Sequence, residues 1–291
     1  MSIKQKTYKY FFFNKNLKQI FIKNMSWLLV SELSVRFLKF LLIPYSIHIL
    51  GASQFGSFYY LLSLSSIFYL FSDLGLSGNL CREYNENQTD ENNSSSLSIF
   101  FYTKTLAIIL CFAISFIQLG GTNEVNSLKL LLIVLFFTFV ENYKKIYISI
   151  LDASKKSEIY SSIRIINGLL LVILGFIVLK TTHSLFYFVL VYLVTNLIEL
   201  GLLLLFFKDK IPKLNKFNFN KSLKMIKTSF PFMLTGIIGL VLSLSDTLII
   251  EQFLGVKMVA YYQAPLKLIA SINVIHISIG KVIYPIMCEL S

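Results

Sequence analysis

Charged residues are scarce in this sequence of 291 residues. Asp, Glu, Lys and Arg together make up 14% of the chain, whereas hydrophobic residues make up 55%. A soluble domain of this length usually carries about 25% charged residues. The composition therefore excludes an ordinary soluble globular domain and indicates a protein that keeps much of its surface in lipid.

The residue types that usually carry catalysis or metal binding are also rare. An odd number of isolated cysteines indicates no disulfide framework, and neither the cysteines nor the histidines have metal-ligand spacing. No phosphate-binding loop, nucleophile elbow or zinc-protease motif occurs. We therefore expect no enzyme activity, no bound metal and no cofactor. The isolated residues are Cys81, Cys111, Cys288, His48, His183 and His276.

The sequence does contain a series of apolar runs, each of roughly 20 residues. A helix of that length crosses about 30 Å of hydrocarbon at 1.5 Å per residue, and it satisfies its own backbone hydrogen bonds in lipid. The sequence therefore predicts an all-α fold, a polytopic membrane bundle of about eight transmembrane helices. The expected helices span residues 25–50, 55–76, 97–119, 128–150, 159–179, 185–207, 230–253 and 260–287.

The net charge of +12 is concentrated between these runs. Nineteen Lys and Arg residues fall in the N-terminal tail and in alternate connections and their flanks, against three on the other side. Because cytoplasmic loops carry the excess of Lys and Arg, we expect a multi-pass protein of the cell inner (plasma) membrane with a cytoplasmic N-terminus. No soluble domain is left to bind nucleic acid, so nucleic acid is not an expected partner.

Two connections carry their own predictions. Residues 85–96 are polar and rich in Asn and Ser, which is typical of a cytoplasmic loop. Residues 211–226 place apolar side chains at helical spacing among lysines. That pattern fits either an interfacial helix on anionic headgroups or an ordinary basic loop.

A short similarity suggests an internal repeat. The first expected helix ends in Ile-Leu-Gly at residues 49–51, and the seventh ends in Phe-Leu-Gly at residues 253–255. The offset is 204 residues, or six helices, which restores the same membrane orientation and indicates a parallel repeat. We therefore divide the chain into a basic cytoplasmic tail (1–24), a six-helix N-lobe (25–207), a basic linker (208–229) and the first two helices of a C-lobe (230–291).

Ionisable residues inside the expected helices are the strongest functional signal, and the first helix holds three of them. Glu32, Arg36 and Lys39 lie at i, i+4 and i+7, so they share one face. Because a charge near the bilayer centre costs about 2.5–3.5 kcal/mol on insertion scales, this stripe must face protein or water. A structural Glu32–Arg36 pair would leave Lys39 without a partner on its own helix, which favours a functional cationic site.

The other intramembrane charges allow more ordinary explanations. Asp246 and Lys267 reach similar depth on the last two helices. Either they form a buried ion pair, or Lys267 faces a cavity and is held by Asp246 until an anion competes for it. Asp73 lies at a helix end, where a loop contact explains it. Glu141 is expected to pair with Lys144 and Lys145 at i+3 and i+4. Arg164 and Glu199 lie near cytoplasmic ends, where snorkelling or pairing suffices.

The sequence resembles a known family through several short motifs taken together and in order. It is similar to the N-terminal part of polysaccharide or O-antigen flippases, within the multidrug/oligosaccharidyl-lipid/polysaccharide exporter superfamily. The motifs are LGASQFG at 50–56, DLG at 73–75, SFP at 229–231, DTLII at 246–250, FLG at 253–255, YYQA at 261–264 and KL at 267–268.

The resemblance implies transport of an undecaprenyl-diphosphate-linked oligosaccharide, as in O-antigen and lipopolysaccharide assembly, by rocking of two six-helix lobes around a cationic cavity. It implies that Arg36, Lys39 and Lys267 bind substrate, with Glu32, Asp73 and Asp246 as candidates for charge pairing or coupling. Lipid-linked oligosaccharide, membrane lipids and other polysaccharide-assembly membrane proteins are the expected partners. With eight helices, the chain resembles an N-terminal, truncated portion of such a transporter.

Two alternatives remain open from the sequence. A multidrug or cation exporter of the same superfamily would need intramembrane carboxylates as its binding site, and Asp73 and Glu199 are candidates. A membrane glycan polymerase or ligase would need a large external loop with basic catalytic groups. The longest external connection here, residues 120–128, holds no His or Arg, which disfavours the enzyme.

Overall fold

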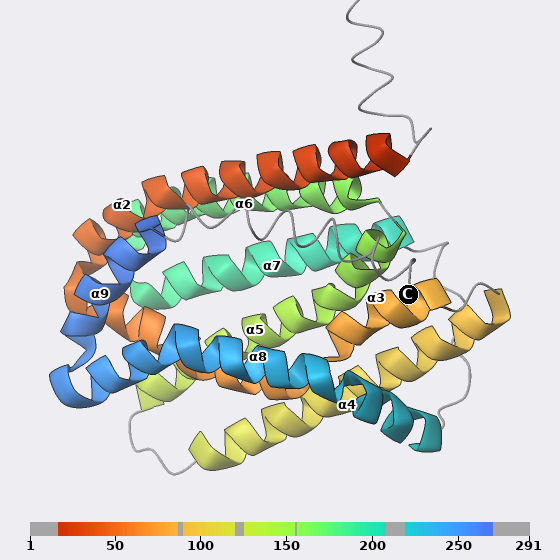
Figure 1. Cartoon of the computed structure of the whole chain (residues 1–291). Coiled ribbons are helices and arrows are strands. Elements are labelled where there is room, and N and C mark those ends of the chain that lie inside the picture. Colours follow the sequence, from red (N-terminus) through yellow and green to blue (C-terminus); the bar gives the residue numbers. More distant parts are fainter. Residues whose placement is uncertain (1–16, 87–89, 120–124, 155, 208–218, 270–291) are drawn as a thin grey trace, which may run out of the picture.

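The computed structural model describes residues 17–86, 90–119, 125–154, 156–207 and 219–269, and every element within these ranges is a helix (Figure 1). The fold is an all-α membrane helix bundle, as predicted. The helices are α2 (Leu17–Asp73), α3 (Leu76–Glu86), α4 (Asp90–Leu119), α5 (Val125–Ala153), α6 (Ser157–Thr182), α7 (Leu185–Phe207), α8 (Phe219–Leu254) and α9 (Val256–Ile269).

Helix α2 contains two crossings, because the chain kinks sharply at Gly51. This residue has φ 75° and ψ 164°, a conformation that glycine adopts without the steric cost of a Cβ atom. Figure 1 shows α2 running along one side of the bundle, turning at one end and returning. The first two expected helices are therefore present, joined by a glycine turn. Left-handed residues Leu74 and Gly75 then end α2, and α3 begins after them.

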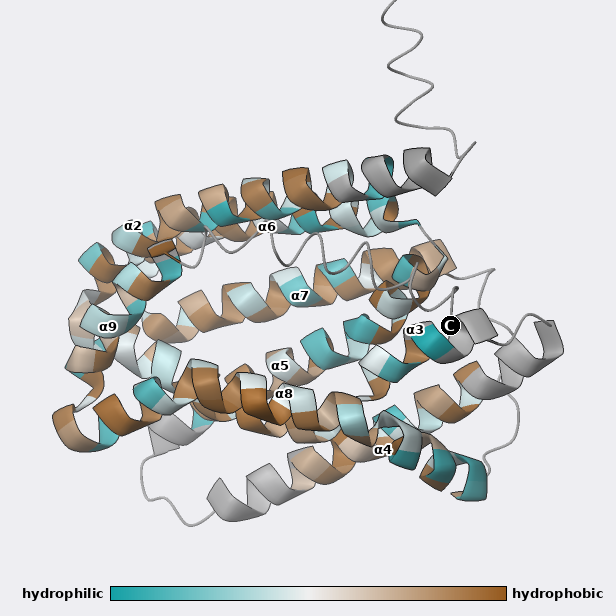
Figure 2. Cartoon of the chain, viewed as in Figure 1, coloured by the Kyte–Doolittle hydropathy of each residue, from teal (hydrophilic) through white to brown (hydrophobic). Residues whose placement is uncertain are grey.

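Within the described residues, four helices are long and apolar enough to cross a membrane. They are Ser26–Asp73, Ser157–Thr182, Leu185–Phe207 and Phe219–Leu254, and a shorter apolar helix spans Leu97–Cys111. Large apolar side chains point outward, such as Leu242 and Phe253 of α8, which are 75% and 76% exposed. Figure 2 shows the apolar colouring along the middle of α8. Such a surface is stable only in contact with lipid or further protein.

Several expected boundaries were wrong. Most expected helices were too short, but the second was too long, because α2 ends at Asp73 rather than at residue 76. Residues 90–96, expected in a polar loop, form the first turns of α4, and α3 was not expected at all. Helix α8 begins at Phe219 rather than at residue 230, so the last part of the expected linker is helical. Polar composition tells where a helix leaves the hydrocarbon but not where its hydrogen bonding stops. Residues 211–218 of the segment that fitted either an interfacial helix or a basic loop, and residues 270–287 of the last expected helix, lie outside the described residues.

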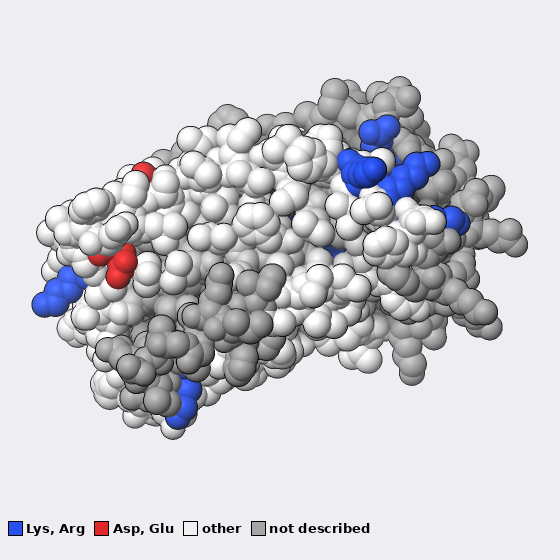
Figure 3. All heavy atoms as spheres, turned by 90° about the horizontal axis from the view of Figure 1, so that it is seen from below, with Lys and Arg blue, Asp and Glu red and all other residues white. Residues whose placement is uncertain are grey.

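The helix ends gather at two opposite ends of the bundle (Figure 1). At one end α2 begins, α5 ends and α8 begins; the Gly51 kink and the α6–α7 and α8–α9 turns lie at the other. Figure 3 shows that Lys and Arg side chains gather at the first end and leave the middle almost free of charge. Exposed Arg82, Lys221, Lys224 and Lys227 belong to this end, which we call the basic end. Its cytoplasmic position remains a prediction.

An aromatic core closes the bundle toward the opposite end. Phe58 of α2 contacts Phe188 and Tyr192 of α7, with ring centroids 5.6 and 5.2 Å apart. Val259 and Ala260 of α9 belong to the same buried cluster. Gly56 lets α9 approach closely, because a Cβ atom there would overlap the carbonyl oxygen of Val256. The last described helix is therefore packed tightly onto α2.

Candidate functional site

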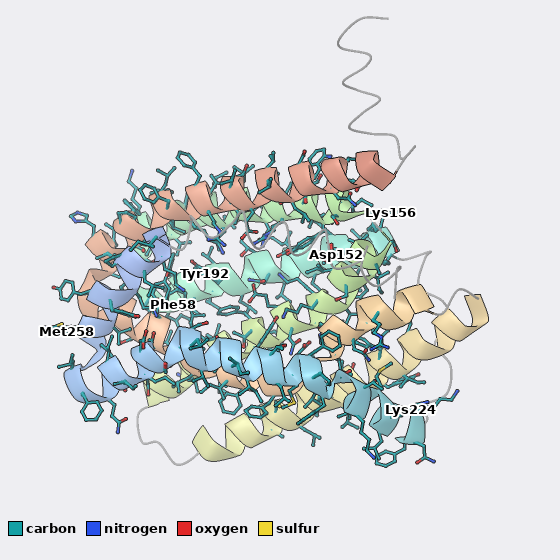
Figure 4. The ribbon with its side chains drawn as sticks, in the orientation of Figure 1. Phe58, Asp152, Lys156, Tyr192, Lys224 and Met258 are labelled. Atoms are coloured by element: carbon teal, nitrogen blue, oxygen red, sulfur yellow. The ribbon has the colours of Figure 1, made fainter. Side chains whose placement is uncertain are left out.

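A cavity of about 640 Å³ lies inside the bundle, lined by α2, α3, α5, α6 and α7. Figure 4 shows two of its lining residues, Tyr192 beside Phe58 in the half of the bundle nearer the Gly51 kink and Asp152 toward the basic end. The cavity therefore extends from the aromatic core toward the basic end. Its charged and phenolic lining residues are Lys39, Tyr69, Glu141, Lys144, Lys145, Asp152, Tyr160, Arg164, Tyr192 and Glu199.

Lys39 is the deepest exposed cation of this cavity. It lies 12 residues before the Gly51 kink, roughly 18 Å along the helix, so it lies deep within the first crossing. Its side chain is nevertheless exposed, because it faces the open space of the cavity. Within the described part of the chain it makes no hydrogen bond or ion pair, although Glu141, Glu199 and Glu32 all act on it electrostatically. Lys39 is thus available to an anion.

Arg36, the second expected binding residue, is held differently. Its Nε donates to Oε1 of Glu32 at 3.1 Å, one helical turn away. The other carboxylate oxygen of Glu32 forms an ion pair with Arg164 of α6. Glu32 therefore bridges two guanidinium groups, and the three side chains together keep one net positive charge. The predicted Glu32–Arg36 pair is present, with Arg164 as an unpredicted third member.

Lys267 of α9 joins the same charged region from the other side. Its ammonium lies 5.4 Å from the ring centroid of Tyr59, and it interacts electrostatically with Lys39 and Arg36. Asp246 instead accepts a hydrogen bond of 2.6 Å from the hydroxyl of Tyr262, so the Asp246–Lys267 pair is not formed. The tertiary structure thus brings the three expected binding residues into electrostatic contact from two helices that are distant in the sequence.

Asp73 is part of a buried structural cluster. Lys104 of α4 donates to its Oδ1 at 2.6 Å and to Ser77 Oγ at 2.6 Å, and the Lys104 side chain is fully buried. The loop contact expected for Asp73 is therefore an interhelical ion pair. Lys104 was counted among the cations that set the membrane orientation, yet it is a core residue. Without Lys104 in the count, the predicted cytoplasmic side still carries more Lys and Arg residues than the other side.

The charges of α5, α6 and α7 were named from the sequence, but their partners on other helices were not predicted. Lys144 pairs with Glu199 at 2.5 Å and with Asn196 at 2.5 Å, both on α7. Glu199 also accepts a hydrogen bond of 2.6 Å from Asn167 of α6. Lys145 lies 4.6 Å from the ring centroid of Tyr69. These tertiary partners replace the predicted pairing of Glu141 with its two neighbouring lysines on the same helix.

The arrangement suits the binding of an anion from which water has been removed. Lys39 has open space beside it, and Arg36, Arg164 and Lys267 add positive charge nearby. Ammonium and guanidinium groups form strong hydrogen bonds with phosphate oxygens, and Arg can do so through two parallel bonds. The hydrocarbon around the bundle strengthens these interactions, because few water molecules screen them.

Comparisons with known proteins agree with this architecture. The sequence model of a family described as "Polysaccharide biosynthesis protein" matches residues 21–291. The fold is similar to that of a solved chain named "protein A", with a TM-score of 0.69 and 13% sequence identity. That match covers 94% of this chain and 64% of the solved one, so this chain spans less than two thirds of its length. No curated protein matches the sequence.

Proposed function

Because this chain belongs to the polysaccharide biosynthesis protein family, we propose that it is a transporter, not an enzyme, that flips a lipid-linked oligosaccharide across the inner membrane. The substrate class is an undecaprenyl-diphosphate-linked oligosaccharide, such as an O-antigen unit. The N-terminus and the basic end face the cytoplasm in this proposal. The substrate enters from that side, where it is synthesised, and leaves toward the periplasm.

The exposure of Lys39 to the cavity supports this proposal more than any other observation. A diphosphate group loses its hydration when it enters a bilayer, and a fixed ammonium group replaces part of that stabilisation. Lys39 is deep in the bundle, accessible and without a direct counter-ion among the described residues. A lysine in such a place costs stability unless an anionic ligand uses it.

The packing of α9 on α2 suggests how access is controlled. The close contact at Gly56 and the aromatic core seal the bundle toward the opposite end, while the cavity extends toward the basic end. In an alternating-access cycle, α8 and α9 would move as part of a second lobe and separate from α2 once substrate is bound. Lys267 would then travel with the moving part, and Lys39 would remain with the N-lobe.

The proposal is tested with Lys39→Ala in the full-length protein, reconstituted in vesicles with a fluorescent prenyl-diphosphate-linked sugar. We expect at least a tenfold lower flipping rate, equivalent to about 1.4 kcal/mol, with partial recovery in Lys39→Arg. The matched control is Lys257→Ala, which removes an exposed lysine outside the cavity. Equal flipping by Lys39→Ala and the unmodified protein would exclude the cationic-site mechanism.

The same vesicles distinguish a cation exporter of the same superfamily. That function would need accessible carboxylates, whereas Asp73 and Glu199 are buried in ion pairs with Lys104 and Lys144. Transport of an organic cation such as ethidium, lost in Glu141→Gln and retained in Lys39→Ala, would favour the exporter over the flippase.

A further inference from the structure

Glu141 is a charged residue of the cavity that the anion-binding proposal leaves without a role. It lies on α5, its side chain is exposed, and it lines the cavity. Within the described part of the chain it forms no hydrogen bond or ion pair. It nevertheless acts electrostatically on Lys39 and Tyr69 of α2, on Tyr160 of α6 and on Tyr192 of α7. Glu141 therefore shares the cavity with groups of three other helices.

The neighbours that could neutralise Glu141 are engaged elsewhere. Lys144 is bound to Glu199 and Asn196, and Lys145 lies over the ring of Tyr69. Among the carboxylates acting on Lys39, Glu141 has the largest effect. Lys39 and Glu141 are therefore opposite charges that face each other across open space, neither of them held by a direct partner in the described part of the chain.

We propose that Glu141 is a specificity-determining residue that competes with the substrate's diphosphate for Lys39; this inference rests on the proposed function. In the empty cavity Glu141 balances Lys39. When the anionic group of the substrate arrives, it takes the ammonium, and Glu141 is displaced toward the hydroxyls of Tyr69, Tyr160 and Tyr192. On release, Glu141 returns to Lys39 and helps to expel the product.

The charge balance of the region explains why a diphosphate would be preferred. With Glu141 ionised, the described charged groups that line the cavity or interact with its lining carry a net charge of +2. A diphosphate diester carries two negative charges and neutralises it, whereas a monophosphate diester carries one and leaves a cation uncompensated. Without Glu141 the net charge rises to +3. The groups counted are Arg36, Lys39, Lys144, Lys145, Arg164, Lys267, Glu32, Glu141, Asp152 and Glu199.

The test measures binding of two probes to the purified full-length protein in detergent: farnesyl-diphosphate-linked glucose and farnesyl-monophosphate-linked glucose. We expect Glu141→Gln to bind the diphosphate about tenfold more tightly, because an internal competitor is removed, and to flip it more slowly, because release is impaired. The matched control is Glu251→Gln, the same chemical change on α8 outside the cavity, which should leave both affinities unchanged.

A double-mutant cycle ties the effect to Lys39. In a Lys39→Ala background, Glu141→Gln should change the affinity for the diphosphate probe by less than about twofold. Unchanged or weaker binding in Glu141→Gln alone, or equal tightening with and without Lys39, would overturn the role of Glu141. Failure of the proposed function itself is a separate result, because it would show as full affinity in Lys39→Ala alone.

Discussion

The contact of α9 with Gly56 gives a quantitative prediction about how the bundle opens. Gly56→Ala places a methyl group against the carbonyl oxygen of Val256, with the amide nitrogen of Ala260 only 3.3 Å away. Both neighbours are backbone atoms, so no side chain can rotate to make room. The helices must instead separate by on the order of 1 Å to restore ordinary contact distances.

The magnitude follows from this overlap. Overpacking in a closely packed core typically costs about 1–3 kcal/mol. The cost applies only while α9 lies on α2, because the methyl group meets nothing once the helices separate. The substitution should therefore shift the equilibrium toward the separated state by about 5- to 150-fold.

Labelling of a buried position measures that shift. Val259 of α9 is fully buried in the aromatic core, so a maleimide should react with Val259→Cys only when α9 leaves α2. We expect Gly56→Ala to accelerate labelling by at least fivefold. The background replaces Cys81, Cys111 and Cys288 with Ser.

A glycine elsewhere in the bundle provides the control. A Cβ atom at Gly201 of α7 would meet nothing within 4 Å, so Gly201→Ala should leave the labelling rate unchanged and stabilise the helix by roughly 0.5–1 kcal/mol. The test compares Val259→Cys alone with Val259→Cys combined with Gly56→Ala. If both proteins have the same Tm and are labelled at the same rate, this contact does not close the bundle.

Three further substitutions test what stabilises the helices, with Tm in detergent as the measurement. Lys104→Met should destabilise by about 3–5 kcal/mol, because it leaves Asp73 buried and charged, and the added change Asp73→Asn should recover part of the loss; an undiminished Tm would mean that the pair is not buried in the membrane. Phe58→Ala should cost about 3–5 kcal/mol, because it empties the centre of the aromatic core; a smaller loss would show that α7 and α9 collapse into the space. Tyr262→Phe should leave Tm unchanged, because its bond to Asp246 is exposed.

The sequence was sufficient to predict the class of fold and the order of the apolar helices along the chain. Runs of about 20 apolar residues have few alternatives in lipid, and glycines marked the turns at Gly51 and Gly255. It could not predict α3 or the true starts of α4 and α8. Outside the hydrocarbon, helical hydrogen bonding continues through polar residues as readily as through apolar ones, so composition no longer marks the boundary.

The depth of a charge followed from the sequence, but its partner did not. Counting residues from a helix end placed Glu32, Arg36 and Lys39 deep on one face, and that reading depends only on the rise of a helix. The roles of Lys144 and Arg164 depend on which helices lie beside one another, because their partners are 52 to 132 residues away in the sequence. The role of Glu141 depends on the same packing, because it lines a cavity formed by several helices. Packing of α5, α6 and α7 decided that Lys144 would be neutralised while Lys39 and Glu141 would face open space.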